Sequence, residues 1–249
     1  MEIRAAAETF LVATITIDRL PALATIAARL RHLFDLDADP EPIAEHLSRD
    51  PALASRLAQH AGLRVPGAWD AFELAVRAMI GQQVSVSAAT TLAGRLAARF
   101  GDTLSMPNSA PDLRVVFPDA KTLANADLLS IGLPRARAAA ISSLAAAVMR
   151  DPALLRTTGS VEHTVAKLVT LSGIGAWTAE YIAMRALREP DAFPVSDLGL
   201  LRAMRRYVAR PSPARLQCRA ERWRPWRAYA VMLLWLDDAV QDSALRRSG

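Results

Sequence analysis

The sequence predicts an all-α fold, and three features of the chain support this prediction. Apolar residues recur at helical spacing in most segments, which run for about 10 to 15 residues. Proline, glycine or aspartate separates these segments, and some begin with a capping side chain, such as Asp50 before Pro51. Only the segment Thr9 to Ile17 is rich in β-branched residues and has the pattern of a strand. We therefore expect many short helices behind a strand-like N-terminus.

The predicted helices follow one another with short breaks, and Gly101 to Phe117 is the longest irregular stretch. They span Leu20 to Phe34, Glu41 to Leu47, Pro51 to His60, Ala71 to Ile80, Ser85 to Phe100, Ala120 to Ala124, Ala126 to Ser130, Pro134 to Met149, Pro152 to Leu155, Val161 to Leu171, Ala176 to Leu187, Leu198 to Val208, Ser212 to Arg222 and Pro225 to Leu236.

The composition is that of a globular protein with a moderately basic charge. The 249 residues are 52% apolar and 22% charged, and the formal net charge is +5. A basic balance is compatible with a polyanionic partner. The N-terminus lacks a signal-peptide pattern, and the apolar run Ala228 to Leu236 is too short to cross a bilayer. We expect a cytoplasmic, chromosome-associated protein with no membrane partner.

Cysteine and histidine give no pattern for a metal site. Cys218 is the only cysteine, so the chain cannot form an internal disulfide, a four-thiolate zinc site or an iron–sulfur cluster. The four histidines show no HxxxH or HxH spacing. We expect no cofactor and no metal bound by side chains.

The most informative segment runs from Leu168 to Arg202. An apolar helix ends at Leu171, the turn SGIG follows at residues 172–175, and a second helix begins at Ala176. The two glycines allow positive φ and close backbone approach. The N–H groups of the turn and of the second helix can then face a phosphate. The alternative is an ordinary αα-hairpin with a glycine turn.

The segment resembles the helix-hairpin-helix, Gly/Pro-rich loop and Asp motif of DNA base-excision glycosylases. Three further segments, Ala71 to Phe100, Leu129 to Ile141 and Ala220 to Trp235, resemble the AlkA-type branch, 3-methyladenine DNA glycosylase II. The resemblance covers residues 20–240 approximately. It implies the helix-hairpin-helix glycosylase fold, in which two helical subdomains flank a cleft, here with a short N-terminal strand remnant.

The resemblance also implies a domain organisation. Residues 1–17 form the strand-like remnant of an α/β domain. Residues 18–64 and 193–249 form the helical subdomain with the catalytic aspartate, and residues 65–192 form the subdomain that ends in the helix-hairpin-helix.

The implied function is DNA base excision repair of alkylation damage. A monofunctional glycosylase without lyase activity would flip 3-methyladenine- or 7-methylguanine-type bases out of duplex DNA and hydrolyse their N-glycosidic bonds. Double-stranded DNA with damaged bases is the expected partner, and a monomer the expected state. The alternatives are a glycosylase for deaminated or oxidised bases, a catalytically silent DNA-binding module and an unrelated helical interaction protein.

The resemblance assigns catalysis to Asp197, which lies 20 positions after Trp177. A carboxylate in a dry cleft stabilises the positive charge that develops on the sugar, or orients a water. The local sequence also fits an N-cap, and both roles can hold together. Trp177 occupies the position where bifunctional glycosylase–lyases carry a lysine, so no Schiff base is expected.

The resemblance assigns the base pocket to Trp177, Tyr181, Trp235 and Gln82. Aromatic faces attract cationic ligands, and 3-methyladenine and 7-methylguanine nucleosides carry a positive charge. The alternative is that these aromatic residues belong to the helical core.

DNA binding is assigned to Gln83, Gly173, Ile174 and Gly175. Gln83 would fill the hole that a flipped base leaves, unless it is only an exposed loop residue. The family also implies a monovalent cation on hairpin carbonyls, here those of Val169, Leu171 and Ile174. Nine arginines between Arg202 and Arg227 add a basic C-terminal quarter, which contacts phosphates or is a solvated face.

Overall fold

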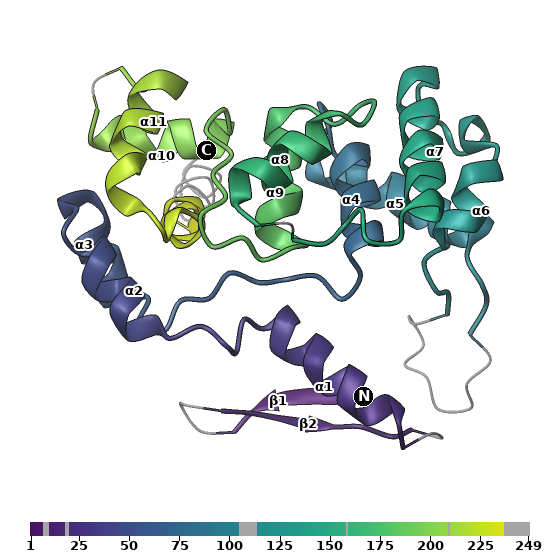
Figure 1. Ribbon diagram of the computed structural model, residues 1–249, viewed down its shortest axis with the longest axis horizontal. Coiled ribbons are helices and arrows are strands. Elements are labelled where there is room, and N and C mark those ends of the chain that lie inside the picture. Colours follow the sequence, from purple (N-terminus) through teal and green to yellow (C-terminus); the bar gives the residue numbers. More distant parts are fainter. Residues whose placement is uncertain (7–9, 18–19, 105–113, 158, 209, 237–249) are drawn as a thin grey trace, which may run out of the picture.

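The computed structural model describes residues 1–6, 10–17, 20–104, 114–157, 159–208 and 210–236, and helices dominate it (Figure 1). This confirms the predicted fold class. The described helices are α1 (Ala22–Leu33), α2 (Pro40–Leu47), α3 (Pro51–Gln59), α4 (Ala71–Ile80), α5 (Val86–Phe100), α6 (Ala120–Asn125), η1 (Leu128–Ile131), α7 (Arg135–Arg150), α8 (Val161–Val169), α9 (Ala176–Arg185), α10 (Leu198–Ala203), η2 (Met204–Arg206), α11 (Pro213–Ala220) and η3 (Glu221–Trp223), and residues 227–236 are also helical.

The N-terminus holds two strands where the sequence predicts one. Strand β2 (Leu11–Thr14) lies within the predicted segment, whose first residue, Thr9, is outside the described residues. It pairs antiparallel with β1 (Glu2–Ala5), and Ile3 faces Ala13 in the register. The expectation of a single strand was therefore wrong. A lone strand leaves its backbone N–H and C=O groups unpaired, and β1 supplies the partners.

Eight of the eleven described helices from α1 to α11 begin at a side-chain cap, as the sequence pattern indicates. Asp70 accepts a hydrogen bond from the Glu73 N–H at 2.8 Å at the start of α4, and Ser85 accepts one from the Ala88 N–H at 3.2 Å at the start of α5. The helix predicted at residues 152–155 is wrong, because these residues form only turns.

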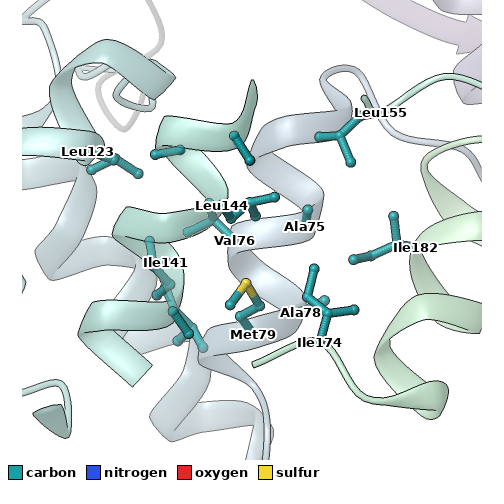
Figure 2. Close-up of a cluster of buried hydrophobic side chains, with 14 of the residues drawn as sticks. Ala75, Val76, Ala78, Met79, Leu123, Ile141, Leu144, Leu155, Ile174 and Ile182 are labelled. Atoms are coloured by element: carbon teal, nitrogen blue, oxygen red, sulfur yellow. The ribbon is translucent and has the colours of Figure 1, made fainter. Parts of the chain in front are cut away.

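The first core lies among helices α4 to α9. Val76 and Met79 of α4 pack with Ile141 and Leu144 of α7, and all four side chains are buried. Figure 2 shows Ile174, from the turn between α8 and α9, directed into this cluster. The core therefore holds the turn between α8 and α9 against helices α4 and α7.

The second core lies among α2, α3, α10, α11 and the helix at residues 227–236. Its largest fully buried side chains are Trp223 and Phe193, whose ring centroids lie 5.9 Å apart in an edge-to-face arrangement. Helix α9 belongs to both cores, because Ile182 packs into the first while Ala183 and Met184 pack into the second. In Figure 1, α8 and α9 accordingly lie between the two groups of helices. Among the described residues, no helix is long and apolar enough to cross a membrane.

A buried aspartate joins the N-terminal segment to the helix at residues 227–236. Asp35 is 1% exposed and follows α1 with a φ of 54°. Its carboxylate accepts hydrogen bonds from the Arg188 guanidinium, from the Val65 N–H at 3.1 Å and from the Tyr229 hydroxyl at 2.7 Å. Burial and the neighbouring Asp35 carboxylate raise the pKa of Tyr229 well above its usual range, so the phenol stays protonated as a donor.

Tyr229→Phe should lower the free energy of unfolding by about 1.5–3 kcal/mol, because it removes a buried hydrogen bond to a charged group. Chemical denaturation of both proteins measures the difference. Tyr207→Phe is the matched control, since Tyr207 is 37% exposed and its ring contact with Arg56 survives the change. Equal midpoints and slopes for Tyr229→Phe and wild type would contradict this assignment.

Candidate active site

Asp197 lies at the start of α10, where it caps the helix. Its Oδ1 accepts a hydrogen bond from the Leu200 N–H at 3.0 Å, and the residue has the extended backbone of an N-cap, with φ −65° and ψ 128°. The side chain is partly buried. The local sequence thus explains how the carboxylate is held, but not what else surrounds it.

Two tryptophan indoles donate hydrogen bonds to the same carboxylate. Trp177, the second residue of α9, donates its Nε1–H to Asp197 Oδ2 at 2.9 Å. Trp235, on the helix at residues 227–236, donates its Nε1–H to Asp197 Oδ1 at 2.9 Å. With the cap bond, three N–H donors from three elements fix both carboxylate oxygens. A carboxylate has only hydrogen-bond acceptors, so its two oxygens can receive all three N–H groups.

The aromatic side chains continue from Asp197 as one cluster. The rings of Trp177 and Tyr181 lie one helical turn apart on α9 and stack, with centroids 5.3 Å apart and planes inclined by 14°. Tyr181 also contacts Trp235, with centroids 6.2 Å apart. The Arg185 guanidinium lies 5.9 Å from the centroid of the Tyr181 ring. The structure therefore brings together the three aromatic residues that the sequence singled out.

A cleft of about 730 Å³ opens beside Asp197 and the α8–α9 turn. Its walls come from the α4–α5 turn, the end of α8, the start of α9 and the start of α10. The lining residues are Gly81, Gln82, Gln83, Val169, Leu171, Gly173, Ile174, Gly175, Trp177, Thr178, Ser196, Asp197 and Leu198. Every part of the predicted site except Tyr181 and Trp235 thus borders one cleft.

A second cavity, of about 380 Å³, also borders the stacked aromatic pair. Helices α4 and α5 form most of its wall, with Trp177 and Tyr181 closing it. The charged side chain in its lining, Arg77, is paired with Glu73 at 2.7 Å and lies over the Phe117 ring. The cavity is mainly apolar and could hold a flat ring against the stacked aromatic pair.

Gln82 and Gln83 lie in the α4–α5 turn, but their side chains have different surroundings. Gln82 donates its amide N–H groups to the Gly173 carbonyl and the Thr178 hydroxyl, each at 2.9 Å, so it ties this turn to the α8–α9 turn. Gln83 is exposed at the cleft with a φ of 56°, a backbone conformation that non-glycine residues adopt infrequently. Arg137 steadies the turn by donating to the Gln82 carbonyl at 2.6 Å.

The α8–α9 turn has the conformation that its glycines permit. Gly173 has a φ of 78°, and a Cβ there would collide with the Cβ of Ala140. Ile174 is 3% exposed, so only its backbone can meet a ligand. Gly175 is the N-cap of α9, and no described side chain accepts a hydrogen bond from the first N–H groups of this helix. Of the three carbonyls considered for a cation, that of Leu171 accepts the Ile174 N–H at 3.1 Å.

Several arginines of the basic C-terminal quarter are engaged inside the protein. Arg219 donates to the Asp50 carboxylate, with its Nε at 2.9 Å. Burial would raise the pKa of Asp50, but hydrogen bonds from Arg219, the Ala52 N–H and Trp223 outweigh it and lower the pKa. Arg224 and Arg227 pair with Asp191 in the same way. These three guanidinium groups stabilise the second core. The arginines of the C-terminal quarter therefore do not all face solvent as one basic surface for DNA phosphates.

Sequence reasoning missed the direct bonds of Trp177 and Trp235 to Asp197, as well as the role of Thr178 and Arg137 behind Gln82. The spacing of Trp177 and Tyr181 by four residues was the one local signal for a shared face. Bonds between residues 38 positions apart, such as that between Trp235 and Asp197, leave no local pattern.

Two protein families match the chain. The HhH-GPD superfamily of base excision DNA repair proteins matches residues 76–228, and the AlkA N-terminal domain matches residues 1–70. The second match extends well beyond the strand-like residues 1–17 that the sequence suggested as a remnant of such a domain.

Curated relatives and solved structures agree with these families. A probable bifunctional transcriptional activator/DNA repair enzyme AlkA from Mycobacterium tuberculosis is 41% identical over 89% of this chain, but the chain spans only 44% of that relative. DNA-3-methyladenine glycosylase 2 from Escherichia coli is 36% identical over 89% of this chain and 74% of the relative. A 3-methyladenine DNA glycosylase from Archaeoglobus fulgidus superimposes with a TM-score of 0.76 and 25% identity, covering 92% of this chain and 78% of the other.

Proposed function

Because the chain belongs to the HhH-GPD superfamily of base excision DNA repair proteins, we propose that it is a monofunctional DNA glycosylase for alkylated bases. It acts as a monomer on duplex DNA and releases 3-methyladenine- and 7-methylguanine-type bases. The observation that carries the proposal is the Asp197 carboxylate, held at a cleft by the indole N–H groups of Trp177 and Trp235.

Asp197 supplies the charge that glycosidic cleavage needs. As the bond between sugar and base breaks, positive charge develops on the sugar, and a fixed carboxylate nearby stabilises it. The three N–H donors hold the carboxylate in place before the reaction, so little reorganisation is needed when the charge appears. A water that attacks the sugar can be oriented by the same oxygens.

The aromatic cluster recognises the base. Alkylation at N3 of adenine or N7 of guanine gives the nucleoside a positive charge, which the face of an aromatic ring attracts. The stacked Trp177 and Tyr181 rings and the neighbouring Trp235 present such faces beside Asp197. Gln82 at the cleft wall adds a polar group toward the base.

The turns around the cleft hold the DNA. The turn at Gly173 to Gly175 leads into the N-terminus of α9, which offers N–H groups and a positive helix dipole to a phosphate. The exposed Gln83 fills the space left by the flipped base. Val169, Leu171 and Ile174 line the same cleft, and their carbonyls are the groups that would hold a monovalent cation beside the phosphate.

The enzyme should leave an intact abasic site, because no lysine is placed to form a Schiff base with the sugar. Lys121 and Lys167 are the only lysines, neither lines the cleft, and Lys167 lies 3.5 Å from Asp151. Borohydride added during the reaction should trap no covalent adduct, and the strand should remain whole until heated in alkali. A stoichiometric protein–DNA adduct would contradict the absence of lyase activity.

A panel of duplexes tests the proposed function and its alternatives. Each carries one lesion: 3-methyladenine, 7-methylguanine, hypoxanthine, uracil or 8-oxoguanine. We expect release of the two alkylated bases to be fastest. Preference for hypoxanthine, uracil or 8-oxoguanine would identify a glycosylase for deaminated or oxidised bases. Binding without release of any base would identify a silent DNA-binding module.

A further inference from the structure

Asp197 is carried by a short segment without regular structure, residues 193–197. Two backbone hydrogen bonds make this segment compact: the Val195 N–H donates to the Phe193 carbonyl at 2.8 Å, and the Asp197 N–H donates to the Pro194 carbonyl at 2.9 Å. A displacement at Phe193 is therefore passed along the segment to Asp197.

One turn of α9 holds both ends of this segment. At its far end, Trp177 donates to Asp197 Oδ2 at 2.9 Å. At its near end, the Phe193 N–H donates to Glu180 Oε2 at 2.8 Å. Trp177 and Glu180 are three residues apart and so lie on neighbouring positions of the helix surface. The segment is thus fastened to α9 at two points, one of them the carboxylate of Glu180.

Glu180 is a half-buried carboxylate beside the segment that carries Asp197. It borders a cavity of about 350 Å³ that it shares with Trp177 and the segment from Phe193 to Ser196. Burial raises its pKa, although the Phe193 N–H and the more distant Arg227 favour the charged form. In the described part of the chain, the Phe193 N–H is its hydrogen-bond donor, while Arg224 and Arg227 pair with Asp191.

We infer that Glu180 is a positioning residue, which sets the place of the Asp197 carboxylate by holding the Phe193 N–H. This inference rests on the proposed glycosylase function. It assigns Glu180 no contact with DNA or base: Glu180 acts only through the segment that carries Asp197. A misplacement of catalytic groups by about 1 Å can slow a reaction on the order of 100-fold.

The test compares three substitutions of Glu180 in single-turnover excision of 7-methylguanine. Glu180→Met keeps length and apolar packing but offers no comparable acceptor, and Glu180→Ala removes the side chain. Both should slow excision on the order of 10- to 100-fold, with affinity for abasic-site DNA unchanged. Glu180→Gln should restore the rate, because its amide oxygen accepts the same N–H.

Glu189→Ala is the matched control. Glu189 is also a carboxylate with a pKa raised by burial, and it accepts a hydrogen bond from the Thr164 hydroxyl at 3.1 Å, away from the segment of residues 193–197. Its substitution should leave the excision rate as in wild type. Wild-type rates for both Glu180→Met and Glu180→Ala would overturn the inference, and so would a Glu180→Gln variant as slow as Glu180→Met.

The indole N–H resonances of Trp177 and Trp235 give a second, activity-independent readout. They report the bonds to Asp197 and are assigned with Trp177→Phe and Trp235→Phe. The Trp177 resonance should move in Glu180→Met and remain in place in Glu180→Gln and Glu189→Ala; no movement in Glu180→Met would overturn the inference. If the wild-type protein releases no base, the proposed function is wrong. The role of Glu180 is still tested in that case, because the indole resonances report the placement of Asp197 without any activity.

Discussion

Asp197→Asn should reduce single-turnover excision of 7-methylguanine by on the order of 10² to 10³, the effect of losing one preorganised electrostatic contact. The amide offers only a dipole to the positive sugar. It also conflicts with its neighbours, because both carboxylate oxygens accept indole N–H groups. The Nδ2 of asparagine must point its hydrogens at one of these donors, which leaves a buried N–H without an acceptor.

The same conflict predicts a loss of stability of about 1–3 kcal/mol, the usual cost of an unsatisfied buried donor. Thermal melts of the variant measure it, and the variant should still fold. Asp70→Asn is the control: Asp70 also caps a helix through one backbone N–H, and asparagine caps about as well as aspartate. An Asp197→Asn variant that excises as fast as wild type would contradict the catalytic assignment.

Gly173→Ala should have the second large effect, a loss of about 2–5 kcal/mol of folding free energy. The φ of 78° is costly for any residue with a Cβ, and the added methyl would meet Ala140 of α7 and lie 3.3 Å from the Met79 Cε. The α8–α9 turn must then move away from the first core. Chemical denaturation measures the loss, and the affinity for DNA should fall together with it.

The Gly175→Ala variant distinguishes an effect on DNA binding from an effect on folding. Gly175 has a φ of −82°, and a Cβ there has no atom within 4 Å. This variant should melt as wild type does but bind duplex DNA more weakly, because the methyl group stands between the N-terminus of α9 and a phosphate. Wild-type affinity, measured at several salt concentrations, would contradict phosphate binding by this turn.

Local chemistry explains how much of the fold could be predicted. Helix α4 spans Ala71–Ile80, as its periodicity and the cap Asp70 indicate. Residues 152–155 were wrongly predicted as a helix, since a short apolar run after proline fits a series of turns equally well. Strand β1 was missed because a four-residue strand shows almost no alternation, and its pairing with β2 is what stabilises it.

The site, like the fold, has parts that the sequence predicted and parts that it could not predict. The resemblance to the AlkA-type glycosylases, which the family and relatives confirm, pointed to Asp197 and the three aromatic residues. The arrangement around Asp197 depends on tertiary contacts between α9, α10 and the helix at residues 227–236, so no spacing could reveal it. Glu180 gave no signal at all, because a single glutamate in a helix is usually a solvated residue.

Release of free base from a duplex with a single 7-methylguanine tests the central claim most directly. The protein, in excess over DNA, is incubated with the duplex, and the released base is separated and measured against time. We predict that 7-methylguanine appears in stoichiometric amount and leaves an intact strand with one abasic site. Fully bound DNA from which no base is released would contradict the account.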